Sequence, residues 1–403
     1  MDFAGRVTNL RLESAEVGRY RARGGGGAAR DARRKRHVIT IGNLSPTKTA
    51  PYSLNPKDLE FGRVCTPNHF LAEYSGKQWR NPRIEALSPF TLHPAANIFH
   101  YAQAIFEGLK AYRQPDGKLA LFRPEMNARR FIASAIRMGI PPVTEELFLE
   151  AIHRLVDVER NFVPEPPGTL YIRPTIVGTE AALGVRSASE FTFFVITLPS
   201  GGYFKELSGT GVVRVYVEQA TARAAPGGTG AVKAAANYAV TLKAISDAKE
   251  RGCSQVLYLD AARRQRVEEL GGMNVFFVRK GELITPTLNG TILPGVTRDS
   301  LLMLGNAIGI PSREADINID EVIEEVQSGD ITEAIACGTA ATVVGIHELV
   351  FADGRVLPVG NGDLGPITSR LFDEIQAIQF GTAPDRFGWM SPVEAYDAVG
   401  ARA

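Results

Sequence analysis

The chain has 403 residues, of which 44% are hydrophobic and 22% are charged, a composition typical of a globular protein with about two to three domains. A formal net charge of +1 gives the bulk of the chain no electrostatic preference for nucleic acid or an anionic membrane. Three widely separated cysteines argue against a disulfide framework and for a reducing compartment, so we expect a cytoplasmic protein without a metal site. The longest apolar run, near 191–199, is too short to cross a bilayer, so no membrane partner is expected.

The first 36 residues differ in composition from the rest. Residues 21–36 contain four consecutive glycines and seven basic residues, with almost nothing apolar to bury. We therefore predict that residues 1–36 form a disordered, basic, Gly/Arg-rich tail. A nucleic-acid-binding arm is the alternative, and it is disfavoured because no aromatic residues alternate with the basic ones.

Residues 37–198 are predicted to form a small N-terminal α/β domain. Pro124 suits the first turn of a helix, and Thr144 suits the N-cap of a second helix whose first turn is acidic. The continuous apolar run at 191–198 predicts a central strand. The expected elements in chain order are short strands within 61–98, a helical turn and strand at 100–112, a hairpin turn at 115–117, a strand at 119–122, two helices from 124 and 145, and strands at 170–174 and 191–198.

A short Pro/Gly stretch follows, and we predict an interdomain linker at 199–210. Residues 211–403 would form a larger C-terminal domain. Its expected elements are a strand at 211–218, a helix ending near 250, strands at 255–259, 274–278 and 283–284, a helix at 296–308, an apolar β-branched segment at 338–344 and a closing amphipathic helix at 366–380.

Lys233 stands out within this second block. Glycines precede it, three alanines follow it, and Asn237 and Tyr238 come directly before a helical pattern. Small neighbours leave room for a bulky planar group, and a partly dry pocket lowers the pKa of an amine because burial disfavours its charged form. Such a lysine is a nucleophile that can form a Schiff base with an aldehyde. A solvated lysine at a helix start is the alternative for the isolated motif.

Pyridoxal phosphate requires an amine, a site for its phosphate and an acid opposite its ring nitrogen. Gly295, Val296 and Thr297 open a predicted helix, where free backbone N–H groups attract an anion. Glu269 is a candidate for the acid. The adjacent Glu268 cannot point into the same site from a strand, since side chains alternate there.

These motifs occur together in an order that resembles the branched-chain-amino-acid aminotransferases of bacterial type, which are fold-type IV pyridoxal phosphate enzymes. The resemblance covers about residues 52–381. The motifs are Tyr101 with Phe106-Glu107-Gly108, Tyr171 to Pro174, Gly227 to Tyr238, Glu269 to Asn274, Leu293 to Arg298, and Gly338-Thr339-Ala340. The resemblance implies two α/β domains, the larger a pseudo-barrel, with the cofactor in the cleft between them.

The resemblance also assigns roles to individual residues. Lys233 would be the catalytic residue and would carry the cofactor. The remaining cofactor-binding residues would be Arg130, Tyr238, Glu269, Leu293, Val296, Thr297 and Thr339. The substrate-binding residues would be Tyr101, Phe106, Tyr171, Tyr203, Gly272 and Ala340. A homodimer, or a higher homo-oligomer, is implied, in which Tyr101 could come from the partner subunit.

The implied reaction is a ping-pong transfer of the amino group of Leu, Ile or Val to 2-oxoglutarate, in biosynthesis or degradation of these amino acids. Glutamate must enter the same pocket, and its distal carboxylate needs a donor. Arg173 is our candidate for this further substrate-binding residue, and a structural ion pair is the alternative for this arginine. A D-amino-acid aminotransferase or aminodeoxychorismate lyase of the same fold is an alternative, as are nucleic-acid binding through the tail and a catalytically silent vitamin B6 carrier.

Overall fold

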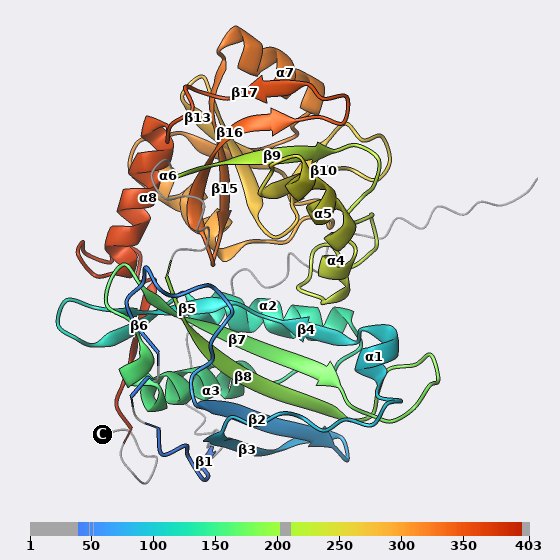
Figure 1. The fold of residues 1–403 in the computed structure, drawn as a ribbon, viewed down its shortest axis with the longest axis vertical. Coiled ribbons are helices and arrows are strands. Elements are labelled where there is room, and N and C mark those ends of the chain that lie inside the picture. Colours follow the sequence, from blue (N-terminus) through green and yellow to red (C-terminus); the bar gives the residue numbers. More distant parts are fainter. Residues whose placement is uncertain (1–38, 48, 51, 202–210, 397–403) are drawn as a thin grey trace, which may run out of the picture. The chain divides into compact units, whose positions relative to one another are not determined.

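The computed structural model describes residues 39–47, 49–50, 52–201 and 211–396. The predicted tail at 1–36 and most of the predicted linker lie outside these residues. Two mixed β-sheets organise the described chain, each with helices packed against it (Figure 1).

The first sheet is built mainly from antiparallel strand pairs of the N-terminal half. Strand β8 lies in its interior between β2 and β7, where its unbroken apolar sequence predicts it to be. Its strands, in spatial order, are β1 (Thr40–Ile41), β3 (Gln78–Ala86), β2 (Asn68–Ser75), β8 (Phe191–Ser200), β7 (Thr169–Gly178), β5 (Leu109–Arg113), β6 (Leu119–Phe122) and β18 (Met390–Val393), with β4 (Ala104–Phe106) paired to β7.

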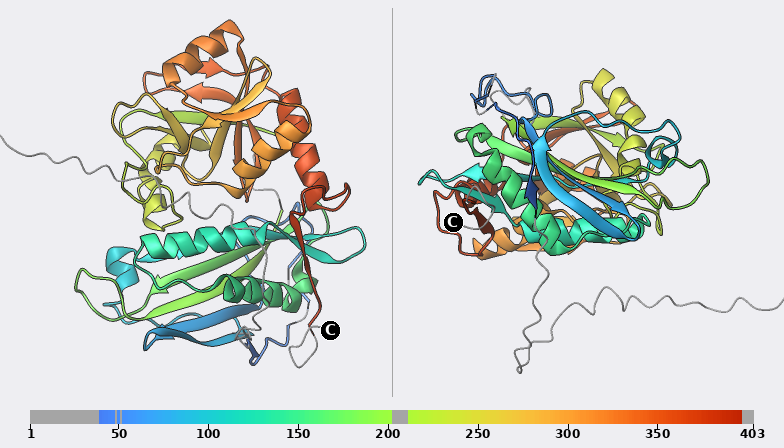
Figure 2. Two further views of the ribbon diagram at one scale, coloured as in Figure 1. Left: turned by 180° about the vertical axis from the view of Figure 1, so that it is seen from behind. Right: turned by 90° about the horizontal axis from the view of Figure 1, so that it is seen from below.

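Helices α2 and α3 run along this sheet, as the view from behind shows (Figure 2). Thr144 caps α3 as predicted, because its Oγ1 accepts the backbone N–H of Leu147 at 3.1 Å. Phe131 of α2 and Phe148 of α3 pack against each other with their ring centres 5.1 Å apart. Phe131 also packs on Phe193 of the sheet, with 5.6 Å between ring centres. The helical elements here are α1 (Asn97–Tyr101), α2 (Pro124–Arg137), α3 (Glu145–Val158) and the 3-10 turn η2 (Arg160–Phe162).

The second sheet contains the strands that follow residue 211. Helices α6 and α8 pack on β15 and β16, and α5 packs on β9 and β10. Its strands, in spatial order, are β11 (Val267–Leu270), β10 (Gln255–Leu259), β9 (Val212–Glu218), β16 (Thr342–Val350), β15 (Ile331–Gly338), β12 (Asn274–Arg279), β13 (Glu282–Pro286) and β14 (Ser312–Ala315), with β17 (Val356–Pro358) on β16. The helices are α4 (Ala236–Ala239), α5 (Leu242–Glu250), α6 (Val296–Ala307), α7 (Ile319–Ser328) and α8 (Pro366–Gln379).

The last strand returns to the first sheet. Strand β18 pairs antiparallel with β6, so residues 390–393 share a sheet with the N-terminal half although the predicted boundary assigns 211–403 to the second domain. The domain boundary at 199–210 therefore remains a prediction, and it does not separate the strands of the two sheets completely.

Glu159, at the end of α3, is fully buried in the first half of the chain. Asn68 Nδ2 donates to its Oε1 at 2.6 Å, while Oε2 has no partner among the described residues. Burial raises the pKa of this carboxyl to about 7. The folded state therefore favours the neutral acid, and this contribution to stability is full below the unfolded pKa near 4.5 and is lost as the pH rises through about 7.

We expect Glu159→Gln to stabilise the protein selectively at high pH, because the amide cannot ionise and keeps an acceptor for Asn68. The gain in free energy of unfolding, measured by urea denaturation, should grow by about 1–3 kcal/mol between pH 5 and pH 8.5. Glu146→Gln, an exposed change in the first turn of α3, is the matched control and should show no such trend. Parallel pH profiles for Glu159→Gln and the unmodified protein would contradict the expectation.

Candidate active site

A cavity of about 480 Å³ is lined by residues from both halves of the chain. Every predicted site residue that the structure describes lines this cavity, with the exception of Tyr101. Tyr203 lies outside the described residues. The cavity-lining residues among those predicted are Phe106, Arg130, Tyr171, Arg173, Lys233, Tyr238, Glu269, Gly272, Leu293, Val296, Thr297, Thr339 and Ala340.

The backbone of Lys233 is held by the first half of the chain. Its N–H donates to Ser134 Oγ of α2 at 3.0 Å, and its carbonyl accepts the N–H of Phe106 at 3.1 Å. Ala235 N–H donates to the carbonyl of Ala104 at 3.0 Å, so this segment runs beside β4 like a short added strand. The Nζ atom donates to the hydroxyl of Tyr238 at 2.8 Å inside the cavity. The lysine is thus positioned by backbone bonds that do not depend on its side chain.

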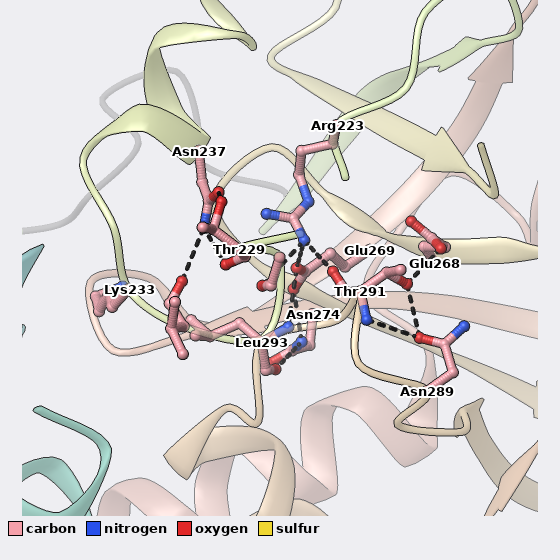
Figure 3. Close-up of polar contacts among 12 residues, drawn as sticks. Arg223, Thr229, Lys233, Asn237, Glu268, Glu269, Asn274, Asn289, Thr291 and Leu293 are labelled. Carbon is pink, nitrogen blue, oxygen red and sulfur yellow. Dashed lines mark hydrogen bonds and ion pairs between the residues drawn. The ribbon is translucent and has the colours of Figure 1, made fainter. Parts of the chain in front are cut away.

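Asn237 closes the glycine-rich loop that carries Lys233. Its Nδ2 donates to the carbonyls of Thr229 and Val232 at 2.7 and 2.8 Å, and its Oδ1 accepts the Thr229 hydroxyl at 2.6 Å (Figure 3). Arg137 of α2 donates to the carbonyl of Gly227 at 2.6 Å. The sequence motif contains Asn237, but Arg137 lies 90 residues before Gly227 and carried no signal of this contact.

Glu269 lies on β11 with its carboxylate buried among donors. Asn274 Nδ2 donates to Oε2 at 2.9 Å, Leu293 N–H donates to Oε1 at 3.0 Å, and the Arg223 guanidinium lies 2.5 Å from Oε1 (Figure 3). Burial raises the pKa of Glu269 to about 7, and the positive charge of Arg223 opposes this rise. Glu268 does not line the cavity, and its carboxylate accepts a hydrogen bond from the Thr291 hydroxyl. Both carboxylates are buried.

Arg223 is a site residue that the sequence analysis missed. Its side chain is 5% exposed, and besides its ion pair with Glu269 it donates to the carbonyls of Thr291 and Gly230 (Figure 3). Arg223 therefore links Glu269, the candidate acid for the ring nitrogen, to the loop that carries Lys233. An arginine within a short loop has no periodic or motif signal, because its role depends on contacts distant in sequence.

The part of the cavity at the start of α6 suits an anion. Helix α6 begins after Gly295. Its first N–H groups have no intrahelical partner, as at any helix start, and no side chain of the described residues caps them. A Cβ atom at Gly295 would lie 2.0 Å from Asn274 Oδ1, so this turn requires glycine. Arg130 is also present, but its Nε and Nη2 pair with both oxygens of Glu107 at 2.6 and 2.8 Å. The positive charge of Arg130 is therefore balanced by a buried carboxylate.

Aromatic side chains and one arginine form the remaining wall. Arg173 Nη2 donates to the Tyr171 hydroxyl at 2.9 Å, and its guanidinium lies 4.6 Å from the Phe106 ring centre. It has no carboxylate partner among the described residues, so its charge is available to a ligand. Phe61, which the sequence analysis did not select, packs edge-on against Tyr171 at 4.8 Å and lines the cavity. The Tyr101 hydroxyl donates instead to the carbonyl of Leu183, away from the cavity.

Comparison with known proteins agrees with this geometry. Residues 104–349 match the family described as amino-transferase class IV. The chain is 45% identical to branched-chain-amino-acid transaminase 1 of Bacillus subtilis over 337 residues, 83% of this chain and 94% of that protein. It is 43% identical to the branched-chain-amino-acid aminotransferase of Mycolicibacterium smegmatis over 338 residues, which are 82% of this chain and 91% of that protein. The chain belongs to the branched-chain-amino-acid aminotransferase family.

Solved structures of aminotransferases share the fold. The Escherichia coli branched-chain amino acid aminotransferase aligns with a TM-score of 0.65 at 24% identity, covering 80% of this chain and 98% of that one. The Thermobaculum terrenum branched-chain amino acid aminotransferase in its PLP form aligns with a TM-score of 0.64 at 25% identity, covering 81% of this chain and 99% of that one. The predictions of a fold-type IV architecture and of an aminotransferase are confirmed, and the alternative functions are not favoured.

Proposed function

We propose that this aminotransferase moves the amino group of L-leucine, L-isoleucine or L-valine to 2-oxoglutarate, with pyridoxal 5'-phosphate as its cofactor. The observation that carries the proposal is the arrangement of Lys233 and Glu269 in one cavity. The amine of Lys233 contacts Tyr238, and Glu269 is buried at a separate wall beside Arg223. Relatives named for this activity at 41–45% identity support the choice of substrates.

The chain's own residues fit such a cofactor. The uncapped start of α6 at Val296 and Thr297 would hold the phosphate together with the hydroxyl of Thr339. Glu269 would hold a proton on the ring nitrogen, and Leu293 would pack on the ring. The Tyr238 hydroxyl would donate a hydrogen bond to the phenolic oxygen of the cofactor. The close approach at Gly295 leaves no room for a side chain beside this end.

Three chemical tasks fall to the protein in this reaction. When bound, the cofactor supplies an aldehyde for an amine and a conjugated ring that delocalises the electron pair left by the substrate Cα proton. The Lys233 amine would take that proton from Cα and return it at C4′ of the cofactor. Backbone N–H groups of Gly272 and Ala340 would bind the substrate carboxylate. The Glu269 carboxylate would keep the ring nitrogen protonated.

The wall of Phe106, Tyr171 and Phe61 would bind the branched side chains by apolar contact. One methylene contributes only about 1–3 kcal/mol to discrimination, so the three amino acids should react at similar rates. Glutamate must use the same wall, and Arg173 would bind its distal carboxylate.

We also propose a homodimer in which Tyr101 faces the partner's cavity. The surface around Tyr101 is apolar and exposed: Phe99 and Leu183 are each 61% exposed and Val185 is 91% exposed. Exposed apolar groups of this kind favour a protein interface. Tyr101 lies outside the cavity of its own chain, so in the dimer each subunit's Tyr101 would complete the site of the other subunit.

No helix among the described residues is both long and apolar enough to span a membrane. A cytoplasmic location remains our proposal. It is supported by the free thiols of Cys65, Cys253 and Cys337, which form no disulfide.

The proposal is tested by the visible absorbance of the purified protein before and after adding L-leucine. The cofactor band should change with L-leucine and return with 2-oxoglutarate. D-alanine is the discriminating control and should leave the band unchanged. A response to D-alanine alone, or no bound cofactor, would refute the proposed reaction.

Arg173→Met should impair the glutamate half-reaction far more than the leucine half-reaction, because it removes the free cation of the wall while keeping apolar bulk. Charge-assisted hydrogen bonds of about 1.5–3 kcal/mol predict a loss of about 10- to 100-fold in kcat/KM for glutamate. Single-turnover kinetics with each amino acid give this ratio. Arg129→Met, at an exposed arginine of α2, is the control. Equal losses for leucine and glutamate would show that Arg173 has no selective role.

A further inference from the structure

Lys110 is a buried lysine that none of the roles above uses. It lies on β5 of the first sheet and is 6% exposed. Its Nζ donates to the carbonyl of Ala340 at 2.8 Å, across to the turn between β15 and β16 of the second sheet. This single bond connects the first sheet to the turn that carries Thr339 and Ala340, both of which line the main cavity.

The charge of Lys110 is not balanced locally. It forms no ion pair with any carboxylate of the described residues, and burial alone lowers the pKa of its amine to about 8. The amine is therefore still mainly protonated at neutral pH. An unpaired buried cation is costly and persists where a ligand or a nearby negative charge offsets the cost. A methionine or leucine would fill the same position without that cost.

The position of Lys110 indicates which charge would offset it. A small enclosed space of about 10 Å³ is lined by Lys110 together with Val296 and Thr339. Val296 and Thr339 also line the main cavity, at its proposed phosphate end. Lys110 therefore lies one residue layer behind that end. Arg130, which lines the same cavity, is already paired with Glu107, so the charge of Arg130 is offset there.

We propose that Lys110 is a positioning residue that fixes the Gly338–Ala340 turn and supplies the unbalanced positive charge that selects a phosphorylated cofactor over its unphosphorylated form. This proposal deepens the proposed function and rests on it for the identity of the cofactor. Coulomb attraction across one residue layer in a partly dry region favours a phosphate dianion by about tenfold or more in affinity. A purely structural lysine would not distinguish the two forms.

The experiment compares the apoprotein with Lys110→Met and Lys110→Gln. Glutamine keeps a donor for the Ala340 carbonyl without the charge, so it separates the hydrogen bond from the electrostatic effect. Lys118→Met is the matched control, because Lys118 lies on the same hairpin with a side chain 78% exposed. The probes are pyridoxal 5'-phosphate and pyridoxal, whose affinities are measured by fluorescence titration, and inorganic phosphate, measured as a shift in Tm.

Both Lys110 variants should bind pyridoxal 5'-phosphate at least about tenfold more weakly, with pyridoxal affinity changed less than about twofold. They should also lose the rise in Tm that inorganic phosphate gives the unmodified apoprotein. Equal weakening of the two pyridoxal compounds, or unchanged selectivity in Lys110→Gln, would overturn the proposal. If the unmodified protein binds neither compound, the proposed function fails instead, and the inorganic phosphate measurement still decides the role of Lys110.

Discussion

Lys233→Ala is expected to abolish turnover while leaving the fold intact. The amine at Nζ is the proposed site of cofactor attachment and the proposed carrier of the Cα proton, so both functions end with its removal. Loss of a nucleophile that also acts as a general base should reduce kcat by at least about 10⁴-fold. Single-turnover kinetics measures the loss. Mass spectrometry after borohydride reduction measures whether the cofactor is still attached to the chain.

The fold should survive because Lys233 is held through its backbone. The bonds to Ser134 and Phe106 use the N–H and the carbonyl of residue 233, which alanine retains. Lys243→Ala is the matched control, since Lys243 is 84% exposed on α5 and pairs only with Asp247 among the described residues. Covalent labelling at another lysine in Lys233→Ala, with turnover retained, would refute the assignment.

Much of the cavity could be predicted from the sequence because its residues occur in short motifs. A glycine that opens a helix, a lysine among small residues and a carboxylate before two glycines each reflect a local backbone requirement. Gly295 illustrates this, since a Cβ atom there would overlap Asn274. Glu269 faces the cavity while Glu268 does not, as alternation along a strand requires.

The unpredicted residues act through contacts distant in sequence. Arg223 reaches Glu269 across 46 positions, and Lys110 reaches Ala340 across 230. The pairing of Arg130 with Glu107 could not be anticipated either, because surface and buried arginines have the same local sequence signature. Strand β18 has weak strand character of its own and forms because β6 offers an unpaired edge.

Glu269→Gln is expected to slow the amino transfer far more than it weakens cofactor binding. The carboxylate can hold a proton on the ring nitrogen, whereas the amide can only hydrogen-bond to it. Loss of one buried charge that stabilises the reacting state should cost about 10²- to 10³-fold in kcat. Cofactor affinity should fall much less, because the phosphate end and Lys233 remain. Stopped-flow absorbance with L-leucine gives the rate, and equilibrium dialysis gives the affinity.

Stability supplies a second expected result for the same variant. Glutamine leaves the Arg223 guanidinium buried without its carboxylate partner, and breaking a buried pair in this way costs about 3–5 kcal/mol. The rate must therefore be measured well below the reduced Tm. Glu268→Gln is the matched control. The Glu268 carboxylate is as buried as that of Glu269, but it lies outside the cavity and accepts a hydrogen bond from the Thr291 hydroxyl. If both glutamine variants slow the reaction to the same extent, the loss reflects disturbed packing around β11, and Glu269 has no specific role at the ring nitrogen.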